Sequence, residues 1–532
     1  MNLSLSTPRC AALSDRLPPT PTALESLIVE QQHLLEQQAR QITEQQQLLE
    51  QQSRLLDEQQ QRLALLEEQL RLLRTQRFGR SSEQQHPNQQ QLFEPQNVPS
   101  APATLPGSES RTNKRRRGRQ GLSPDLPRQP IYLYLSDAQK AGAHETFFVK
   151  VKEELDITPA KVQVLEYFQE KAVFVEAGTR RLVEAERPAH PLGKAVVSVA
   201  FLAYLIVAKY CDALPLYRLE GIFTRYGGSV SRTTLARWLI QLALELQPLI
   251  NLLRDEQLAS DYIQGDETRL KVLKEPGLKA SSHKWFWIMR GGPPDRPSVL
   301  FEYDRSRGKA VAERLLEDFS GRYFQSDGYS SYDAICQRKG IIHLGCWDHV
   351  RRKFVDAEKG QPPRSSSVRP SYASEALERI GELYRIERQI EALPVAEKYH
   401  QRQQRSVPAL KTLHTWFQQQ APKLAKGGLT RDAIDYALHQ WPKLTRYCEH
   451  GSLRISNILA ENAIRPVAVG RKAWLFADTP AGARASAVYF SLVETAKANR
   501  LEPYDYLCRV LQRLPEAKTV EDWEALLPWN IQ

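Results

Sequence analysis

The chain has 532 residues, enough for three or four domains and a sizeable core. Its 73 Lys and Arg against 62 Asp and Glu give a net charge of +11, which favours an anionic partner, most commonly nucleic acid. The six cysteines form no C-x-x-C pair, no apolar run reaches the ~18–20 residues of a spanning helix, and the N-terminus lacks a signal-peptide pattern. We therefore expect a cytoplasmic protein without a disulfide framework or a membrane partner.

A Gln-rich segment at residues 24–76 carries a seven-residue repeat of Leu and Ile. The repeat runs through Ile28, Leu35, Ile42, Leu49, Leu56, Leu63 and Leu70. A heptad kept over this length predicts a coiled coil, with a helix roughly 70 Å long. A Gln-rich tract without stable pairing is the alternative. The preceding residues, 1–23, are rich in Ser, Thr and Pro and are expected to be a disordered tail.

Residues 77–128 are predicted to be a linker rich in Gln, Pro and Ser. The linker contains a basic cluster, Arg115, Arg116 and Arg117, beside a glycine. Clustered arginines suit contacts with phosphates, although a solvated basic linker has the same composition. The following residues, 129–188, mix short strand-like runs with charge and predict a small mixed domain.

A helical region follows at residues 189–255. One apolar-periodic helix starts near Pro215 and ends at a Gly turn, and a second opens with Ser231 as its cap. Arg232 and Arg237 lie in the first turns of this second helix. The arrangement suits a helix-turn-helix DNA reader, and an ordinary helical hairpin is the alternative.

From residue 256 the pattern becomes strand-like. The expected order is a meander of three strands, a helix, a fourth strand and a fifth, at residues 262–268, 285–289, 298–303, 309–319, 323–326 and 341–346. With an acid on the first and fourth strands, this is the pattern of an α/β ribonuclease H-like core in two parts, 256–357 and 451–500. An all-helical insertion at 358–450 separates the parts, and a helical tail covers 501–532.

Three acidic residues are candidates for metal binding and catalysis: Asp266, Asp327 and Glu461. The first lies on an expected strand, the second ends another, and the third lies in the first turn of an expected helix. Carboxylates suit Mg²⁺, and two ions can clamp the attacking and leaving oxygens of an in-line phosphoryl transfer. Most acids are solvated surface charges, so the alternative for each is a surface role. Glu494 is a rival third acid, although Lys497 at i+3 suggests a structural ion pair.

Four segments together resemble the insertion-sequence-66 family of bacterial DDE transposases. They are Gly265–Thr268, Phe324–Tyr329, the Cys-Trp-Asp-His-Val-Arg-Arg-Lys-Phe run at 346–354, and Ala460–Pro466 continuing into Gly470–Phe476. The likeness covers most of residues 24–515. It departs at 129–188, where the family's cysteine-based zinc module has no cysteines here, and at Ser456 and Asn462, which replace usual Asp and Arg residues.

The resemblance implies cleavage at the ends of a mobile DNA element and joining of the freed 3′-hydroxyl to target DNA. It implies Asp266, Asp327 and Glu461 as catalytic ligands of two Mg²⁺ ions, for which Mn²⁺ should substitute. It also implies DNA as substrate, a homo-oligomer formed through the coiled coil, a place at the nucleoid, and accessory proteins of the same element as possible partners. Two alternatives stay open: another ribonuclease H-like nuclease or resolvase, and a catalytically decayed DNA-binding regulator.

Basic residues near the acids are candidate contacts to the DNA backbone. They are His349, Arg351, Arg352, Lys353, Arg465, Arg471 and Lys472. A solvated basic face is the alternative for the run at 351–353. His343, Cys346 and His349 have even spacing that could indicate zinc, but a fourth ligand is missing, and we do not expect a zinc site.

Overall fold

The computed structural model describes residues 21–78, 128–133, 135–140, 147–150, 161–176, 179–193, 195–362 and 370–531. Residues 1–20 of the expected disordered tail, most of the linker and the cluster at Arg115, Arg116 and Arg117 lie outside these residues, whereas residues 21–23 are helical. The chain forms two compact units. The larger comprises Met1–Ser81, His190–Ala213 and Leu239–Gln532, and the smaller comprises Ser82–Ala189 and Leu214–Trp238.

The heptad segment forms one long helix, α1 (Pro21–Phe78). The Leu and Ile side chains of its seven-residue repeat are all exposed, from 48% at Leu70 to 64% at Leu49. Exposed apolar side chains at a regular heptad spacing are typical of an unpaired coiled-coil strand. The helix therefore agrees with the sequence prediction, and its pairing stays a prediction.

The centre of the larger unit is a five-stranded sheet in the order β5-β4-β3-β6-β7. Its strands are β3 (Tyr262–Leu270), β4 (Lys284–Gly291), β5 (Ser298–Asp304), β6 (Tyr323–Gln325) and β7 (Ile342–Leu344). The first three form an antiparallel meander, whereas β6 and β7 run parallel to β3. All five strands overlap the predicted ones, because each alternating apolar run stops at a turn.

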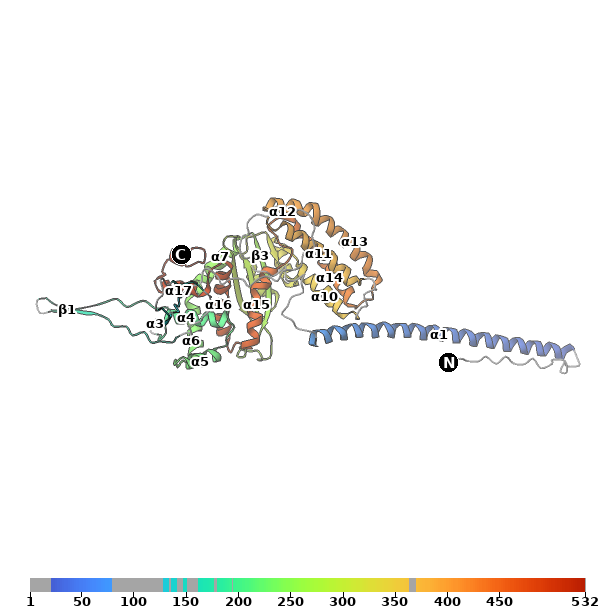
Figure 1. The fold of residues 1–532 in the computed structure, drawn as a ribbon. Coiled ribbons are helices and arrows are strands. Elements are labelled where there is room, and N and C mark those ends of the chain that lie inside the picture. The colour runs from blue at the N-terminus through green and yellow to red at the C-terminus, as the bar shows by residue number, and fades with distance from the viewer. Residues whose placement is uncertain are drawn as a thin grey trace. The chain divides into compact units, whose positions relative to one another are not determined.

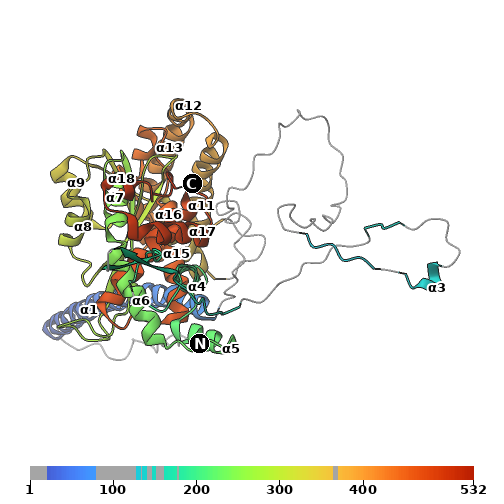
Figure 2. The same cartoon turned by 90° about the vertical axis from the view of Figure 1, so that its left-hand side faces the viewer.

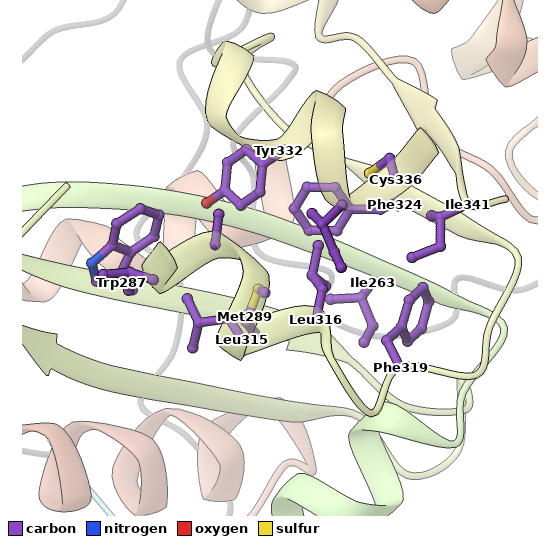
Figure 3. Close-up of a cluster of buried hydrophobic side chains, with 13 residues drawn as sticks. Ile263, Trp287, Met289, Leu315, Leu316, Phe319, Phe324, Tyr332, Cys336 and Ile341 are labelled. Atoms are coloured by element: carbon purple, nitrogen blue, oxygen red, sulfur yellow. The ribbon is translucent and has the colours of Figure 1, made fainter. Parts of the chain in front are cut away.

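One face of the sheet carries a hydrophobic core under α8 (Lys309–Leu316) and α9 (Asp333–Lys339). Figure 3 shows Ile263, Trp287 and Phe324 from the strands packed against Leu316 and Cys336 from the two helices. Side chains alternate along a strand, so residues of even number on β3 face the opposite side. That opposite side is where Asp266 lies.

The second face is covered by the C-terminal helices. They are α15 (Ile458–Trp474) and α16 (Pro480–Ala498). In the chain they are followed by α17 (Pro503–Arg513) and α18 (Val520–Glu524), while α7 (Gln247–Leu258) lies along β5 and packs its Leu258 against the core of the first face. Figure 2 shows α8 and α9 on one side of the sheet and α16 and α17 on the other. On this face Phe286 and Phe301 pack against Phe490 of α16, with ring centroids 6.4 and 5.6 Å away. The sheet is thus buried on both faces.

In the sequence, a helical region separates the two parts of this α/β layer, and Figure 1 shows its helices grouped together. It consists of α10 (Trp347–Gly360), α11 (Tyr372–Ile390), α12 (Val395–Gln401), a π-helical turn (Arg402–Ser406), α13 (Val407–Gln420) and α14 (Leu429–Leu444). Its described residues form no strand, and the bounds of the expected insertion at 358–450 stay a prediction. Phe354 and Phe417 stack at 5.6 Å in its core.

The smaller unit holds α3 (Asp137–Lys140), an antiparallel hairpin of β1 (Lys171–Glu176) and β2 (Thr179–Glu184), and α5 (Leu216–Arg225). The helix α6 (Arg232–Glu245) begins in this unit and continues into the larger one, where α4 (Val199–Tyr210) also lies. Ser231 Oγ accepts a hydrogen bond from the amide of Thr234 at 3.2 Å, which caps α6 as the sequence predicts. Every helix in the described part of the chain is too short or too polar to cross a lipid bilayer.

Candidate active site

Asp266 and Asp327 come from neighbouring parallel strands. The register pairs Gln264 of β3 with Gln325 of β6, and each acid follows its glutamine by two residues. Because side chains alternate, both acids are placed at the same end and on the same face of the sheet. Local bonds fix their carboxylates: Asp266 Oδ1 accepts from the amide of Glu267 at 2.8 Å, and Asp327 Oδ1 accepts from the amide of Tyr329 at 2.9 Å.

Buried amide side chains attach the third acid to this face. Gln264 Nε2 donates to Gln325 Oε1 at 2.9 Å and to the carbonyl of Ser456 at 3.1 Å. Its Oε1 accepts from the amide of Ala460 at 3.2 Å, at the start of α15. Unpaired buried amides would be costly, so these bonds hold the first turn of α15 against β3. Glu461 lies in that turn, directly after Ala460.

The acids form one electrostatic group. Burial raises the pKa of Asp266 well above its usual value, and the charges of Glu267, Glu461 and Asp327 raise that pKa further. Like charges raise each other's pKa only when they are close. The charges of Asp327 and Glu461 therefore reach the Asp266 carboxyl, although these acids are distant in sequence.

Glu461 is held by groups from α10. His349 Nδ1 lies 3.4 Å from Glu461 Oε1, and the Arg352 guanidinium lies 3.1 Å from Glu461 Oε2. Burial lowers the pKa of His349, and Glu461 acts on that pKa in the opposite direction. The Cys346 Sγ is 4.0 Å from Glu461 Oε1, and burial raises the pKa of this thiol well above its usual range. Ligand atoms of Cys346, His349 and Glu461 all lie within 4.8 Å of one another.

Glu267 is held from the other side of β3. Its side chain is only 1% exposed and pairs with Arg307, whose guanidinium lies 2.5 Å from Oε1. Tyr332 donates to Glu267 Oε2 at 3.3 Å. Burial and the charge of Asp327 raise the pKa of Glu267, while Arg307 opposes them. Glu267 is thus already paired, unlike the adjacent Asp266.

The helical region also reaches the site. Tyr436 of α14 donates its hydroxyl to the main-chain carbonyl of Asp327 at 2.8 Å, and Lys353 of α10 lies over the Tyr436 ring at 4.6 Å. Sequence reasoning missed Tyr436, Arg307 and the two glutamines. The glutamines had a visible signal, since Gln264 and Gln325 both stand two residues before an acid in an apolar strand. Nothing in the sequence marked Tyr436 among the polar residues of the insertion.

Two sequence candidates take up other positions. Glu494 pairs with Lys497 at 2.8 Å on α16, and its charge is not among those that act on Asp266. Both ring nitrogens of His343 are engaged, Nε2 with Ser326 and Nδ1 with Asp333, each at 2.8 Å. His343 is therefore not part of the group that Cys346 and His349 form with Glu461.

The donor set suits hard cations. Burial leaves Asp266 with an unfavourable negative charge that a cation would stabilise, and the carboxylates of Asp327 and Glu461 add to that negative charge. Arg352 pairs with Glu461 and partly offsets its charge, but the Arg352 side chain is itself 57% exposed. These residues fit magnesium better than a cysteine-rich zinc site.

Comparison with known proteins identifies the family. The profile described as "Transposase IS66 family" matches residues 194–485, and the profile of the IS66 C-terminal element matches residues 491–529. The chain belongs to the IS66 transposase family. A third profile, "Transposase C of IS166 homeodomain", matches residues 65–131, so the match to this transposase family extends from the end of α1 almost to the C-terminus.

Relatives of this IS66 transposase family member occur in Sinorhizobium fredii. The uncharacterized protein y4qI is 32% identical over 392 residues, which cover 71% of this chain and 71% of that protein. The uncharacterized protein y4jD is 30% identical over 440 residues, covering 78% of this chain and 83% of that protein. Both are similar along most of their length.

The candidate DNA contacts are spread over several elements. Arg232 and Arg237 are exposed on α6, Arg352 and Lys353 are exposed on α10, and Arg465 and Lys472 are exposed on α15. Arg351 and His349 are half-buried on α10. Arg471 donates to Thr268 Oγ1 at 3.3 Å and to the carbonyl of Arg269, so it also holds the end of β3. A transposase acts on DNA, and the role of each of these residues stays a prediction.

Proposed function

We propose that the chain is a DDE transposase in which Asp266, Asp327 and Glu461 hold two divalent cations. One observation supports this most: β3 and β6 pair in parallel, and buried glutamines attach α15 to them, so that the charges of Asp327 and Glu461 both act on Asp266. The sheet order, with an antiparallel meander beside parallel strands, supports a ribonuclease H-like core. The domain boundaries given above belong to the same proposal.

The residues of the chain divide the work between binding and positioning. Magnesium held by the three acids would supply Lewis-acid stabilisation of the attacking and leaving oxygens of a phosphodiester. Gln264 fixes the distance between the helix acid and the strand acids, and Tyr436 fixes the main chain at Asp327. His349 lies beside the Glu461 carboxylate and would orient it when its ring is protonated. Because both hydrolysis and joining are in-line displacements, one arrangement of acids serves both steps.

The basic residues on α6 and α10 suit contacts with DNA phosphates. Arg352 and Lys353 extend from α10 beside the acids, where they would contact phosphates on either side of the cleaved bond. The α5–α6 pair would read the element end, with Arg232 and Arg237 at the start of α6. The exposed heptad seam of α1 would pair two copies, so that two element ends are held together before joining. We place this activity in the cytoplasm, at the DNA.

The test is cleavage and joining of the element's own ends with purified protein and Mg²⁺. Asp266→Asn, Asp327→Asn and Glu461→Gln should each abolish both nicked and joined products while DNA binding persists. Glu494→Gln is the matched control, since its carboxylate is also buried but pairs with Lys497. Cleavage retained by any of the three variants would remove that residue from the site.

The assay also separates the alternatives. Nicks without joined products would favour a nuclease or resolvase. DNA binding without any Mg²⁺-dependent cleavage by the wild-type chain would favour a decayed regulator, for which the exposed Asn462 and the buried Ser456 are the sequence departures to examine.

A further inference from the structure

Two charged side chains near the C-terminal end of α1, Glu68 and Arg71, bind the main chain at the ends of two helices of the helical insertion. Glu68 Oε2 accepts a hydrogen bond from the amide of Leu429, the first residue of α14, at 3.1 Å. Arg71 Nε donates to the carbonyl of Gly360, the last residue of α10, at 2.9 Å. A negative group at a helix start and a positive group at a helix end are each favourable.

The start of α14 lacks a side-chain acceptor within the described part of the insertion itself, and Glu68 supplies one. The N-cap position of α14 is Gly428, which offers no side chain to its free amides. Glu68 supplies the acceptor from a distant part of the chain, and its Oε1 accepts from Gln361 Nε2 at 3.1 Å. Gly360 leaves the space: a Cβ there would lie 3.2 Å from Glu68 Cγ and 2.7 Å from a Leu429 methyl group. We call the set Glu68, Arg71, Gly360, Gln361 and Leu429 the clamp.

The clamp uses the outer face of α1. When the seam residues Leu63 and Leu70 are assigned to position a, Glu68 falls at f and Arg71 at b, with Leu65 and Leu72 at c. Leu65, Glu68, Arg71 and Leu72 are half-buried, whereas the seam residues beside them are exposed, Leu66 at 56% and Leu73 at 60%. Positions b, c and f point away from the partner in a two-stranded coiled coil. Attachment of α1 to the helical insertion therefore leaves its seam residues exposed and available to a second helix.

We infer that Glu68 and Arg71 lock the outer face of α1 to the helical insertion so that the opposite seam can receive α1 of a second copy. This rests on the proposed pairing for the identity of the partner, while the clamp itself rests on contacts within one chain. Pairing through positions a and d would then place the two insertions on opposite sides of the rod. Since Tyr436 in the middle of α14 contacts Asp327, the helix that begins at the clamp also reaches the candidate site.

Two measurements on the full chain separate clamp from seam. The first is hydrogen exchange of the peptide that contains Leu429, compared between wild type, Glu68→Ala and the control Glu58→Ala. Glu58 is an exposed outer-face glutamate earlier on α1. Loss of a helix N-cap should accelerate exchange in Glu68→Ala by roughly fivefold, and Glu58→Ala should exchange as wild type does.

The second measurement is the oligomeric state by sedimentation, for Glu68→Ala and for the seam double variant Leu49→Lys with Leu56→Lys. The seam variant should dissociate and keep wild-type exchange at Leu429, whereas Glu68→Ala should stay associated. Equal exchange in Glu68→Ala and Glu58→Ala would overturn the clamp, and dissociation of Glu68→Ala would show that the outer face is itself the interface. If the seam variant remains associated, the proposed pairing through the seam is wrong. The clamp and the cleavage mechanism are tested separately, by hydrogen exchange and by the cleavage assay.

Discussion

Arg402 holds the helical insertion together from inside, and replacing it by Met should destabilise that insertion strongly. The side chain is 3% exposed and forms a two-pronged pair with Glu387 of α11, at 2.9 and 2.6 Å. It also donates to three main-chain carbonyls, those of Tyr447, His450 and Leu453, at 2.7 to 2.9 Å. Arg402→Met leaves the Glu387 carboxylate and these carbonyls without their donor.

Removing one partner of a buried ion pair costs about 3–5 kcal/mol, because the other charge stays buried and unpaired. That is a large share of the ~5–15 kcal/mol by which a typical protein is stable. Urea unfolding followed by circular dichroism measures the loss. The control is Arg385→Met, which breaks an exposed pair with Glu382 on the surface of α11 and should cost less than about 1 kcal/mol. Equal losses in the two variants would refute the assignment of Arg402 as the central contact of the insertion.

Three further changes address the site itself. Tyr436→Phe removes the hydrogen bond to the Asp327 carbonyl and should slow cleavage by roughly tenfold at unchanged DNA affinity, because one hydrogen bond contributes about 0.5–1.5 kcal/mol. An unchanged cleavage rate would show that this hydrogen bond does not support the site. Gly265→Ala places a Cβ 2.7 Å from the Phe324 ring and should lower the free energy of unfolding by about 1–3 kcal/mol. Thermal denaturation measures this loss, and an unchanged melting temperature would contradict it. Arg352→Gln should make the salt dependence of DNA binding shallower by about one phosphate contact, and an unaltered slope would place Arg352 off the DNA.

The strands and the long helix could be predicted from local patterns. Alternating apolar runs and a heptad are properties of neighbouring residues, so the elements around Asp266 and Asp327 and the whole of α1 appear where the sequence places them. The parallel pairing of β3 with β6 is not a local property: the chain leaves β5 at one edge of the meander and returns through α8 to pair with β3 at the other edge.

The contacts that hold the site together could not be predicted in this way. Gln264 bonds to Ser456 and Ala460, Tyr436 to Asp327, and Glu68 to Leu429, each across a long stretch of chain. A polar residue in a strand or helix does not reveal its partner, because the partner depends on how the elements pack. The same holds for Arg352 and His349: their basic character suggested DNA, and the structure adds the Glu461 carboxylate as their neighbour.

The most direct test of the central claim is the binding of Mn²⁺ to the purified protein, followed by electron paramagnetic resonance without DNA. Wild type and Glu494→Gln should bind the ion alike. Asp266→Asn, Asp327→Asn and Glu461→Gln should each weaken binding by more than the roughly 10–100-fold that loss of an outer-shell partner costs, because each would remove a ligand. Wild-type affinity in all three variants would contradict the claim that these acids together hold the catalytic metals.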